Sequence, residues 1–311
     1  MDRNTRRSTS ETKHQLSVLC LSFAFCILSC LLLAAQTAPF RARVDIVQVT
    51  VSVTDASGRL ITGLTKEDFQ IFEDGVEQRI TQFTDQRVPV SLGILLDASD
   101  SMRGQPVVDA REALDRFVGD LLLNEDEVFV ATFSHLPRLV AKWTKPPSTL
   151  RGSLAGLKPS GGTAIYDALS DTAQLFEQRI NLRAAMVVVS DGADTASDRS
   201  LLQATDVIRR SDAFVYAIAI DSAEARESTR VNPEALRDIT ALTGGYTEVV
   251  RTAADLGPAT ARIADELNKQ YTLGFSSAKP PDRSWRPLRV RVRKGEYFVR
   301  ARRGYFAQPA R

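Results

Sequence analysis

One stretch constrains the fold of this chain more than any other. Residues 90–96 are apolar or small at every position, a pattern typical of a parallel strand buried on both faces. The run breaks directly into Asp97, Ser99 and Ser101, and helical spacing of apolar residues follows from residue 107. These three side chains are therefore expected on a strand-to-helix loop, where open α/β sheets bind their ligands. One carboxylate and two hydroxyls form a hard-oxygen surface suited to magnesium or manganese, not to zinc or copper.

Two further loops carry oxygen ligands in the same kind of position. Gly161 and Gly162 precede Thr163 where a helical pattern begins, and Asp191 follows the apolar run 184–189. Taken alone, a Gly-Gly-Thr sequence is usually a helix start and an Asp-Gly sequence is usually a turn. In this order, and at successive strand-to-helix loops, they indicate one site together with the Asp97 loop.

The middle of the chain, from residue 89 to about 264, alternates strand and helix patterns. This alternation predicts an α/β fold with a doubly wound, mostly parallel sheet. The expected strands are 90–96, 127–133, 139–143 (forming a hairpin with 127–133), 184–189 and 213–220, and the expected helices include 148–157, 164–178 and 199–211.

The flanks on both sides of this middle part have strand patterns instead. Residues 44–53 alternate apolar and polar side chains, and 59–61 are expected to return as a hairpin. A second antiparallel pair is expected from 69–72 and 77–83. Near the other end, residues 288–293 alternate aliphatic side chains with arginine. These arginines are expected to face solvent, because aromatic side chains that could stack on a polyanion are missing from that strand face.

Neither flank has enough strands to be stable alone, so the two are expected to pair into one small β unit. The domain boundaries that follow are 1–38 for a signal peptide or membrane anchor, 39–87 and 266–311 for the two sets of β strands, and 88–265 for the α/β domain inserted between them.

The N-terminus resembles an export signal. Four basic residues (Arg3, Arg6, Arg7 and Lys13) precede the uncharged apolar run 16–35, which ends in small residues. Cleavage after Ala35 or Ala38 would release an exported domain. Because the run is about as long as a membrane-spanning helix, an uncleaved anchor is the open alternative, and a lipoprotein-like box at Cys30 is a weaker one. The expected location is periplasmic, extracellular or anchored to the cell envelope.

Composition excludes several chemistries beyond this leader. All three cysteines lie inside it, and His135 is the single histidine outside it, which argues against disulfides, thiol nucleophiles and histidine-bound metals. His135 is expected in a solvated turn. Residues 1–38 hold four of the 40 Lys+Arg and two of the 38 Asp+Glu, which leaves 36 against 36 in the remainder. A neutral chain has no general attraction to nucleic acid.

With these three loops in view, the chain resembles the von Willebrand factor type A domain, and the loops match that family's metal-ion-dependent adhesion site. The resemblance implies a divalent cation, Mg²⁺ or Mn²⁺, and a remaining position for a carboxylate from a partner. Asp100 departs from the pattern, since many members have glycine there, and we expect it to point to solvent. The implied metal ligands are Asp97, Ser99, Ser101, Thr163 and Asp191.

The flanks add a second resemblance. The segments 51–55, 64–69, 270–275 and 300–305 are similar to a subfamily of exported bacterial proteins with this domain, described from Acidobacteria. This likeness says little about function.

Two classes of function remain open on these residues. The first is an exported, non-enzymatic binding module in which the cation bridges to an Asp or Glu of a protein partner. The alternative is a magnesium-dependent phosphoryl-transfer or other hydrolytic enzyme, which lacks support because the chain has no P-loop, no Asp-x-Asp at residue 97 and only His135 as a histidine general base.

Overall fold

The computed structural model describes residues 46–191, 193–221, 232–252 and 255–307. These residues belong to one compact unit, Asp45–Arg311. The expected signal peptide or anchor lies outside the described residues. Within the described part, no helix is both long enough and apolar enough to span a membrane.

A six-stranded sheet forms the centre of the α/β part, as the strand pattern predicted. Its order is β10-β9-β8-β5-β6-β7, and every neighbouring pair is parallel except β6 and β7, which form the expected hairpin. The fold class predicted from the sequence is therefore confirmed. The strands are β5 (Val90–Asp97), β6 (Glu127–Phe133), β7 (Pro137–Thr144), β8 (Arg183–Ser190), β9 (Phe214–Ile220) and β10 (Thr247–Val250).

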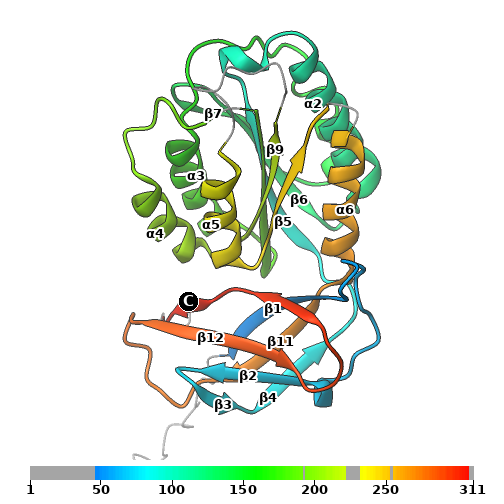
Figure 1. Ribbon diagram of the computed structural model, residues 1–311, viewed down its shortest axis with the longest axis vertical. Coiled ribbons are helices and arrows are strands. Elements are labelled where there is room, and N and C mark those ends of the chain that lie inside the picture. Colours follow the sequence, from blue (N-terminus) through cyan, green and yellow to red (C-terminus); the bar gives the residue numbers. More distant parts are fainter. Residues whose placement is uncertain (1–45, 192, 222–231, 253–254, 308–311) are drawn as a thin grey trace, which may run out of the picture. The chain divides into compact units, whose positions relative to one another are not determined.

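Helices cover both faces of this sheet (Figure 1). Alternate residues of β5 separate the two cores: Leu92 packs with α2 and α6 on one face, whereas Leu95 packs with α3, α4 and α5 on the other. This two-sided burial is why residues 90–96 of β5 are apolar or small. The helices are α2 (Gln105–Arg116, continued by a π turn at Phe117–Leu121), α3 (Ile165–Ala173), α4 (Leu201–Ser211), α5 (Pro233–Thr243) and α6 (Leu256–Lys269).

The prediction of a helix over 148–157 is wrong. That segment has a short 3-10 helix, η4 (Pro147–Leu150), followed by turns. Gly152 adopts a positive φ of 72°, which helical residues do not have. The next expected helix, 164–178, is shorter than predicted, because α3 ends at Ala173 and tightens into the 3-10 helix η5 (Gln174–Gln178).

The strands that precede the α/β domain in the sequence pair with the strands that follow it, as predicted. One sheet has the order β13-β1-β11-β4 and the other the order β14-β12-β2-β3, so each mixes strands from both ends of the chain. A shared apolar core, which includes Val51, Ile71 and Leu273, fills the space between them. The exact domain boundaries remain a prediction. The strands are β1 (Ile46–Thr54), β2 (Phe69–Glu73), β3 (Val76–Gln78), β4 (Ile80–Thr84), β11 (Tyr271–Ser276), β12 (Trp285–Val292), β13 (Phe298–Ala301) and β14 (Gly304–Phe306).

The hairpin expected between 44–53 and 59–61 is present only as a turn and one antiparallel bridge, so it is much shorter than predicted. Thr54 bridges Leu60, and the N–H of Ile61 donates a hydrogen bond of 2.8 Å to the carbonyl of Val53. The partners of β1 are instead β11 and β13, both from the far end of the sequence. The second expected pair is present as β2 and β3, whereas β4 joins the other sheet beside β11.

Strand β12 alternates buried aliphatic and exposed arginine residues, as predicted. The expected lack of a stacking aromatic needs correction. Phe72 on the neighbouring strand β2 lies with its ring centroid 5.1 Å from the guanidinium of Arg289 and 5.7 Å from that of Arg291. The aromatic ring was missed because it comes from another strand.

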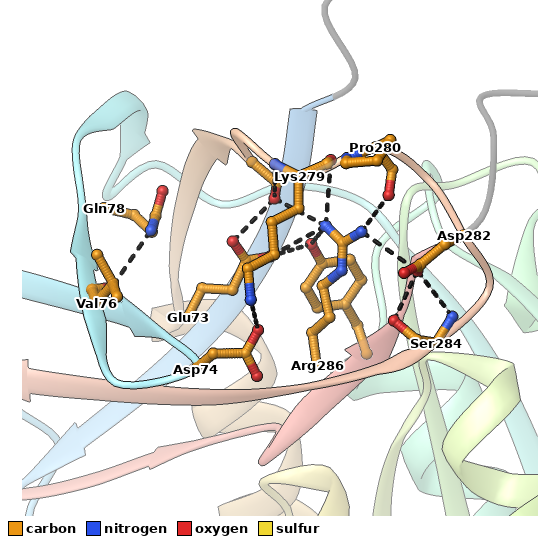
Figure 2. Close-up of polar contacts among 11 residues, drawn as sticks. Glu73, Asp74, Val76, Gln78, Lys279, Pro280, Asp282, Ser284 and Arg286 are labelled. Carbon is orange, nitrogen blue, oxygen red and sulfur yellow. Dashed lines mark hydrogen bonds and ion pairs between the residues drawn. The ribbon is translucent and has the colours of Figure 1, made fainter.

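Arg286 is the exception on β12, since it is buried and points into a polar cluster (Figure 2). Its guanidinium lies 3.4 Å from Glu73 and donates a hydrogen bond of 2.8 Å to Ser277. It also donates to the carbonyl of Pro280. Glu73 accepts a further hydrogen bond of 2.5 Å from Tyr305. This cluster fastens the β11–β12 connection to the hairpin of β2 and β3.

Buried polar contacts also join α6 to the β strands. Glu266 accepts hydrogen bonds from Ser52 of β1 at 2.8 Å and from Tyr216 of β9 at 3.0 Å. Its second carboxylate oxygen pairs with Arg300 of β13. One buried carboxylate therefore contacts the six-stranded sheet and the β unit at once.

Candidate functional site

Asp97 closes β5 and is fully buried. Its two carboxylate oxygens accept hydrogen bonds from the backbone N–H of Ser99 at 2.8 Å and from the hydroxyl of Ser190 at 2.5 Å. Burial raises the pKa of the Asp97 carboxyl to about 6, and the hydrogen bonds from Ser190 and Ser99 offset only part of that rise. Keeping the Asp97 carboxyl ionised therefore costs free energy in the folded protein.

A chain of hydroxyls connects the first loop to the third. The hydroxyl oxygens of Ser99 and Ser101 lie 3.0 Å apart, and Ser101 donates a hydrogen bond of 2.7 Å to Asp191. Asp191 is buried, and burial raises the pKa of its carboxyl, while the hydrogen bond from Ser101 lowers it. Four of the five predicted residues (Asp97, Ser99, Ser101 and Asp191) thus lie within one hydrogen-bonded group.

The second loop is fixed beside the first by backbone contacts. Asp100 donates its N–H to the carbonyl of Gly161 at 2.9 Å, and Ser160 donates its N–H to the carbonyl of Ala98 at 2.7 Å. Thr163 follows two residues after Gly161 and is buried. The side chain of Asp100 is exposed, as expected, and pairs with Arg103 at 2.8 Å.

The donor set fits a hard divalent cation. Asp97 and Asp191 are both buried, and no ion pair to either carboxylate is found among the described residues. Serine and threonine hydroxyls complete a set of oxygen donors without nitrogen or sulfur, which is the preference of Mg²⁺ and Mn²⁺. The set contains just two carboxylates. Within the described residues, no group of three or more His, Cys, Asp or Glu side chains could hold a metal ion.

His135 lies in the turn between β6 and β7 and is exposed, as expected, but it also contacts the second loop. The N–H of Gly162 lies 3.3 Å from its Nε2 atom and 3.4 Å from Nδ1. A Cβ atom added at Gly161 would lie 2.5 Å from Nε2. The paired glycines therefore make room for the imidazole, a role that the sequence did not reveal.

Three other polar residues around the site were missed from the sequence. Ser190 donates to Asp97, while Asp194 and Thr195 contact the start of α3. Ser190 had one available signal, because it is the last residue of the strand that precedes Asp191. The roles of Asp194 and Thr195 depend on contacts with a helix about 30 residues earlier in the chain, which no local pattern encodes.

Comparison with known proteins identifies the domain in which these loops lie. Residues 92–193, a span that includes all five predicted site residues, match the family model of the von Willebrand factor type A domain. A curated relative, an uncharacterized protein of Synechocystis sp., is 32% identical over 87 residues, which are 27% of this chain and 20% of that protein. The chain therefore spans about a fifth of the length of this relative.

Two solved structures share the fold. A von Willebrand factor type A protein from Catenulispora acidiphila is 13% identical with a TM-score of 0.52, over 75% of this chain and 71% of that one. An aerotolerance-related membrane protein from Bacteroides fragilis is 22% identical with a TM-score of 0.50, over 58% of this chain and 99% of that one. Residues 92–193 thus carry a von Willebrand factor type A domain, set in an α/β unit that has the fold of that family.

Proposed function

We propose that this chain is an exported binding module that holds Mg²⁺ or Mn²⁺ and bridges through it to a carboxylate of a protein partner. The observation that carries the proposal is the hydrogen-bonded group that joins Ser99, Ser101 and Asp191 beside buried Asp97. In the proposed site these four residues and Thr163 are the metal ligands. Von Willebrand factor type A domains commonly bind protein partners, which agrees with this function.

The charges at the site support a bound cation. Two buried carboxylates with raised pKa values are costly unless a positive charge lies near them. Three neutral hydroxyls add oxygen donors but no negative charge. The negative charge of the protein ligands would therefore not exceed the positive charge of a divalent cation at this site. The cation would retain affinity for one further anionic ligand, and a partner's Asp or Glu can supply it.

The hydroxyls of the site favour binding over catalysis. Ser99 interacts with Ser101, and Ser101 donates to Asp191; within the described residues neither hydroxyl contacts a histidine that could act as general base. His135 faces the Gly161–Gly162 backbone instead. A magnesium-dependent phosphoryl-transfer or hydrolytic enzyme remains the alternative function, and turnover of a phosphate ester that is lost in Thr163→Val would favour it.

Export is part of the proposal and rests on the sequence. Basic residues precede the apolar run 16–35, as in signal peptides and N-terminal anchors. Fractionation of cells that express the chain with a C-terminal tag tests this part. Recovery in the cytosol with residues 1–38 intact would contradict it.

The partner-binding part is tested by capture from envelope extract with the tagged full chain. Capture should require Mg²⁺ or Mn²⁺, disappear with a chelator, and be absent with the Thr163→Val variant at equal loading. It should resist moderate salt, because a direct metal–carboxylate bond is not screened as surface ion pairs are. Capture that survives the chelator and Thr163→Val but fades with salt would contradict the proposal and direct attention to the arginine face of β12.

A further inference from the structure

The N-terminus of α3, directly after Thr163, is capped by residues from a different loop. Ala164 occupies the N-cap position and has no side chain that could accept a hydrogen bond from the helix. The carboxylate of Asp194 accepts a hydrogen bond from the N–H of Tyr166 at 3.1 Å, and the hydroxyl of Ser197 accepts one from the next N–H, that of Asp167, at 3.1 Å. The loop after β8 thus performs the capping that the helix sequence lacks.

The same loop holds the backbone of Thr163 on both sides. The N–H of Thr163 donates to the hydroxyl of Thr195 at 3.0 Å. The carbonyl of Thr163 accepts from the N–H of Thr195 at 2.8 Å and from that of Ala196 at 3.1 Å. These contacts restrain both peptide groups that flank the Thr163 side chain, so they fix the direction of the Cα–Cβ bond from which its hydroxyl projects.

The loop is fixed at its far end as well. Asp167, buried in the first turn of α3, accepts hydrogen bonds from the N–H of Asp198 at 2.8 Å and of Arg199 at 3.1 Å. The contacts run in both directions, since the loop caps the helix and a carboxylate of the helix caps the loop. Residues 194–199 and the start of α3 are therefore joined into one hydrogen-bonded element.

From this arrangement we propose that Thr195 is a positioning residue for the cation site. Asp191 and Thr195 belong to the same loop, so one segment would supply a ligand and also orient a second ligand, Thr163. The inference rests on the proposed metal-binding function, because a role in orienting Thr163 for the cation has no meaning without that cation.

The position of Thr195 allows this role to be separated from a role in folding. Thr195 is exposed, so a valine of similar shape there disturbs no core packing. The substitution removes the hydroxyl that accepts the N–H of Thr163 and leaves the backbone contacts of residue 195 in place. Groups that orient metal ligands typically change metal affinity by about 10- to 100-fold when removed.

The test is calorimetric titration of Mg²⁺ and of Mn²⁺ into the full chain and three variants. Thr195→Val should weaken the affinity at least about 10-fold, whereas Thr195→Ser, which keeps the hydroxyl, should bind as the unsubstituted protein does. Ser200→Ala is the matched control, because it removes a hydroxyl that accepts the N–H of Gln203 at 3.3 Å in α4 and does not contact Thr163. Its affinity should be unchanged.

A measurement on the metal-free protein separates positioning from general loosening. Exchange of the Thr163 amide hydrogen should accelerate in Thr195→Val, while amides in the middle of α3 and the thermal midpoint stay close to those of the unsubstituted protein.

Each of these results either supports or overturns the positioning role of Thr195. Unchanged metal affinity in Thr195→Val, with normal binding by the unsubstituted chain, overturns the positioning role and leaves the proposed function intact. An equal loss of affinity in Ser200→Ala overturns it too, since the effect would then be general. If the unsubstituted chain binds neither metal, the proposed function fails and the inference fails with it.

Discussion

The hydroxyl of Ser101 donates a hydrogen bond of 2.7 Å to the carboxylate of Asp191, although 90 residues separate them in the sequence. This contact joins the loop after β5 to the loop after β8. The two strands are parallel neighbours in the sheet, so their carboxyl ends reach the same edge. Adjacency of the strands is therefore what converts two distant motifs into one candidate site.

Asp97→Asn should stabilise the metal-free protein. Asp97 is fully buried, and its pKa of about 6 lies above the ordinary value of 3.8. A shift of this size corresponds to a cost of the ionised form of about 3 kcal/mol at neutral pH. The raised pKa gives the sign: the cost is complete above about pH 6 and absent below about pH 4, where both the folded and the unfolded carboxyl are protonated. Urea unfolding of both proteins at several pH values between 4 and 7 measures the difference.

Asp126→Asn is the control for Asp97→Asn and should act in the opposite direction. Asp126 is equally buried but pairs with Arg87 and accepts the N–H of Val90 at 2.9 Å. Its replacement leaves Arg87 without its anionic partner and should destabilise the protein. If both substitutions change the free energy of unfolding in the same direction, the lack of a cationic partner does not explain the effect of replacing Asp97.

Arg286→Met should destabilise the β unit strongly. The Arg286 side chain is only 3% exposed, and its loss leaves Glu73 buried without its cation. Breaking a buried pair in this way costs about 3–5 kcal/mol. Arg289→Met on the same strand removes an exposed arginine with no carboxylate partner within the described residues and should cost under about 1 kcal/mol. Chemical denaturation compares the two; equal costs would show that burial of the pair contributes nothing.

Deleting residues 40–86 should make residues 270–306 sensitive to protease. Strand β11 pairs with β1 on one side and β4 on the other, and β12 pairs with β2, so the deletion removes three of the partners of the C-terminal strands. It also removes Val51 and Ile71 from the shared core. Limited proteolysis followed by mass spectrometry locates the cleavage sites. A C-terminal segment as resistant as in the complete chain would mean that the two flanks fold independently.

The central sheet could be predicted because its signal is local. A strand covered by helices on both faces carries a nearly continuous apolar run, as in residues 90–96 of β5 and 184–189 of β8, and this composition is visible in a short window. The partners of β1 could not be predicted in the same way. Val51 pairs with Tyr271, and the alternation of β1 is equally compatible with a nearby hairpin, so long-range packing and not local sequence decides the pairing.

The residues of the candidate site differ in the same way, since some have a local sequence signal and others depend on long-range packing. Asp97 ends one strand, and Ser99 and Ser101 follow it in a recognisable spacing, so the sequence predicts all three as ligands. The contact of Thr195 with Thr163 depends on how two loops meet and leaves no trace in the local sequence. The contact of His135 with the N–H of Gly162 also depends on how two loops meet, and its only local signal was the pair of glycines.

The most direct test of the central claim is calorimetric titration of Mg²⁺ and Mn²⁺ into the full chain and into Thr163→Val. Thr163 is only 4% exposed, and valine has nearly the same shape, so the variant should fold while lacking one hydroxyl ligand. We predict one cation per chain for the unsubstituted protein and a loss of affinity of at least about 10-fold in the variant, at an unchanged thermal midpoint without metal. Equal cation binding by both proteins, or no binding by the unsubstituted chain, would contradict the claim that these loops form a metal site.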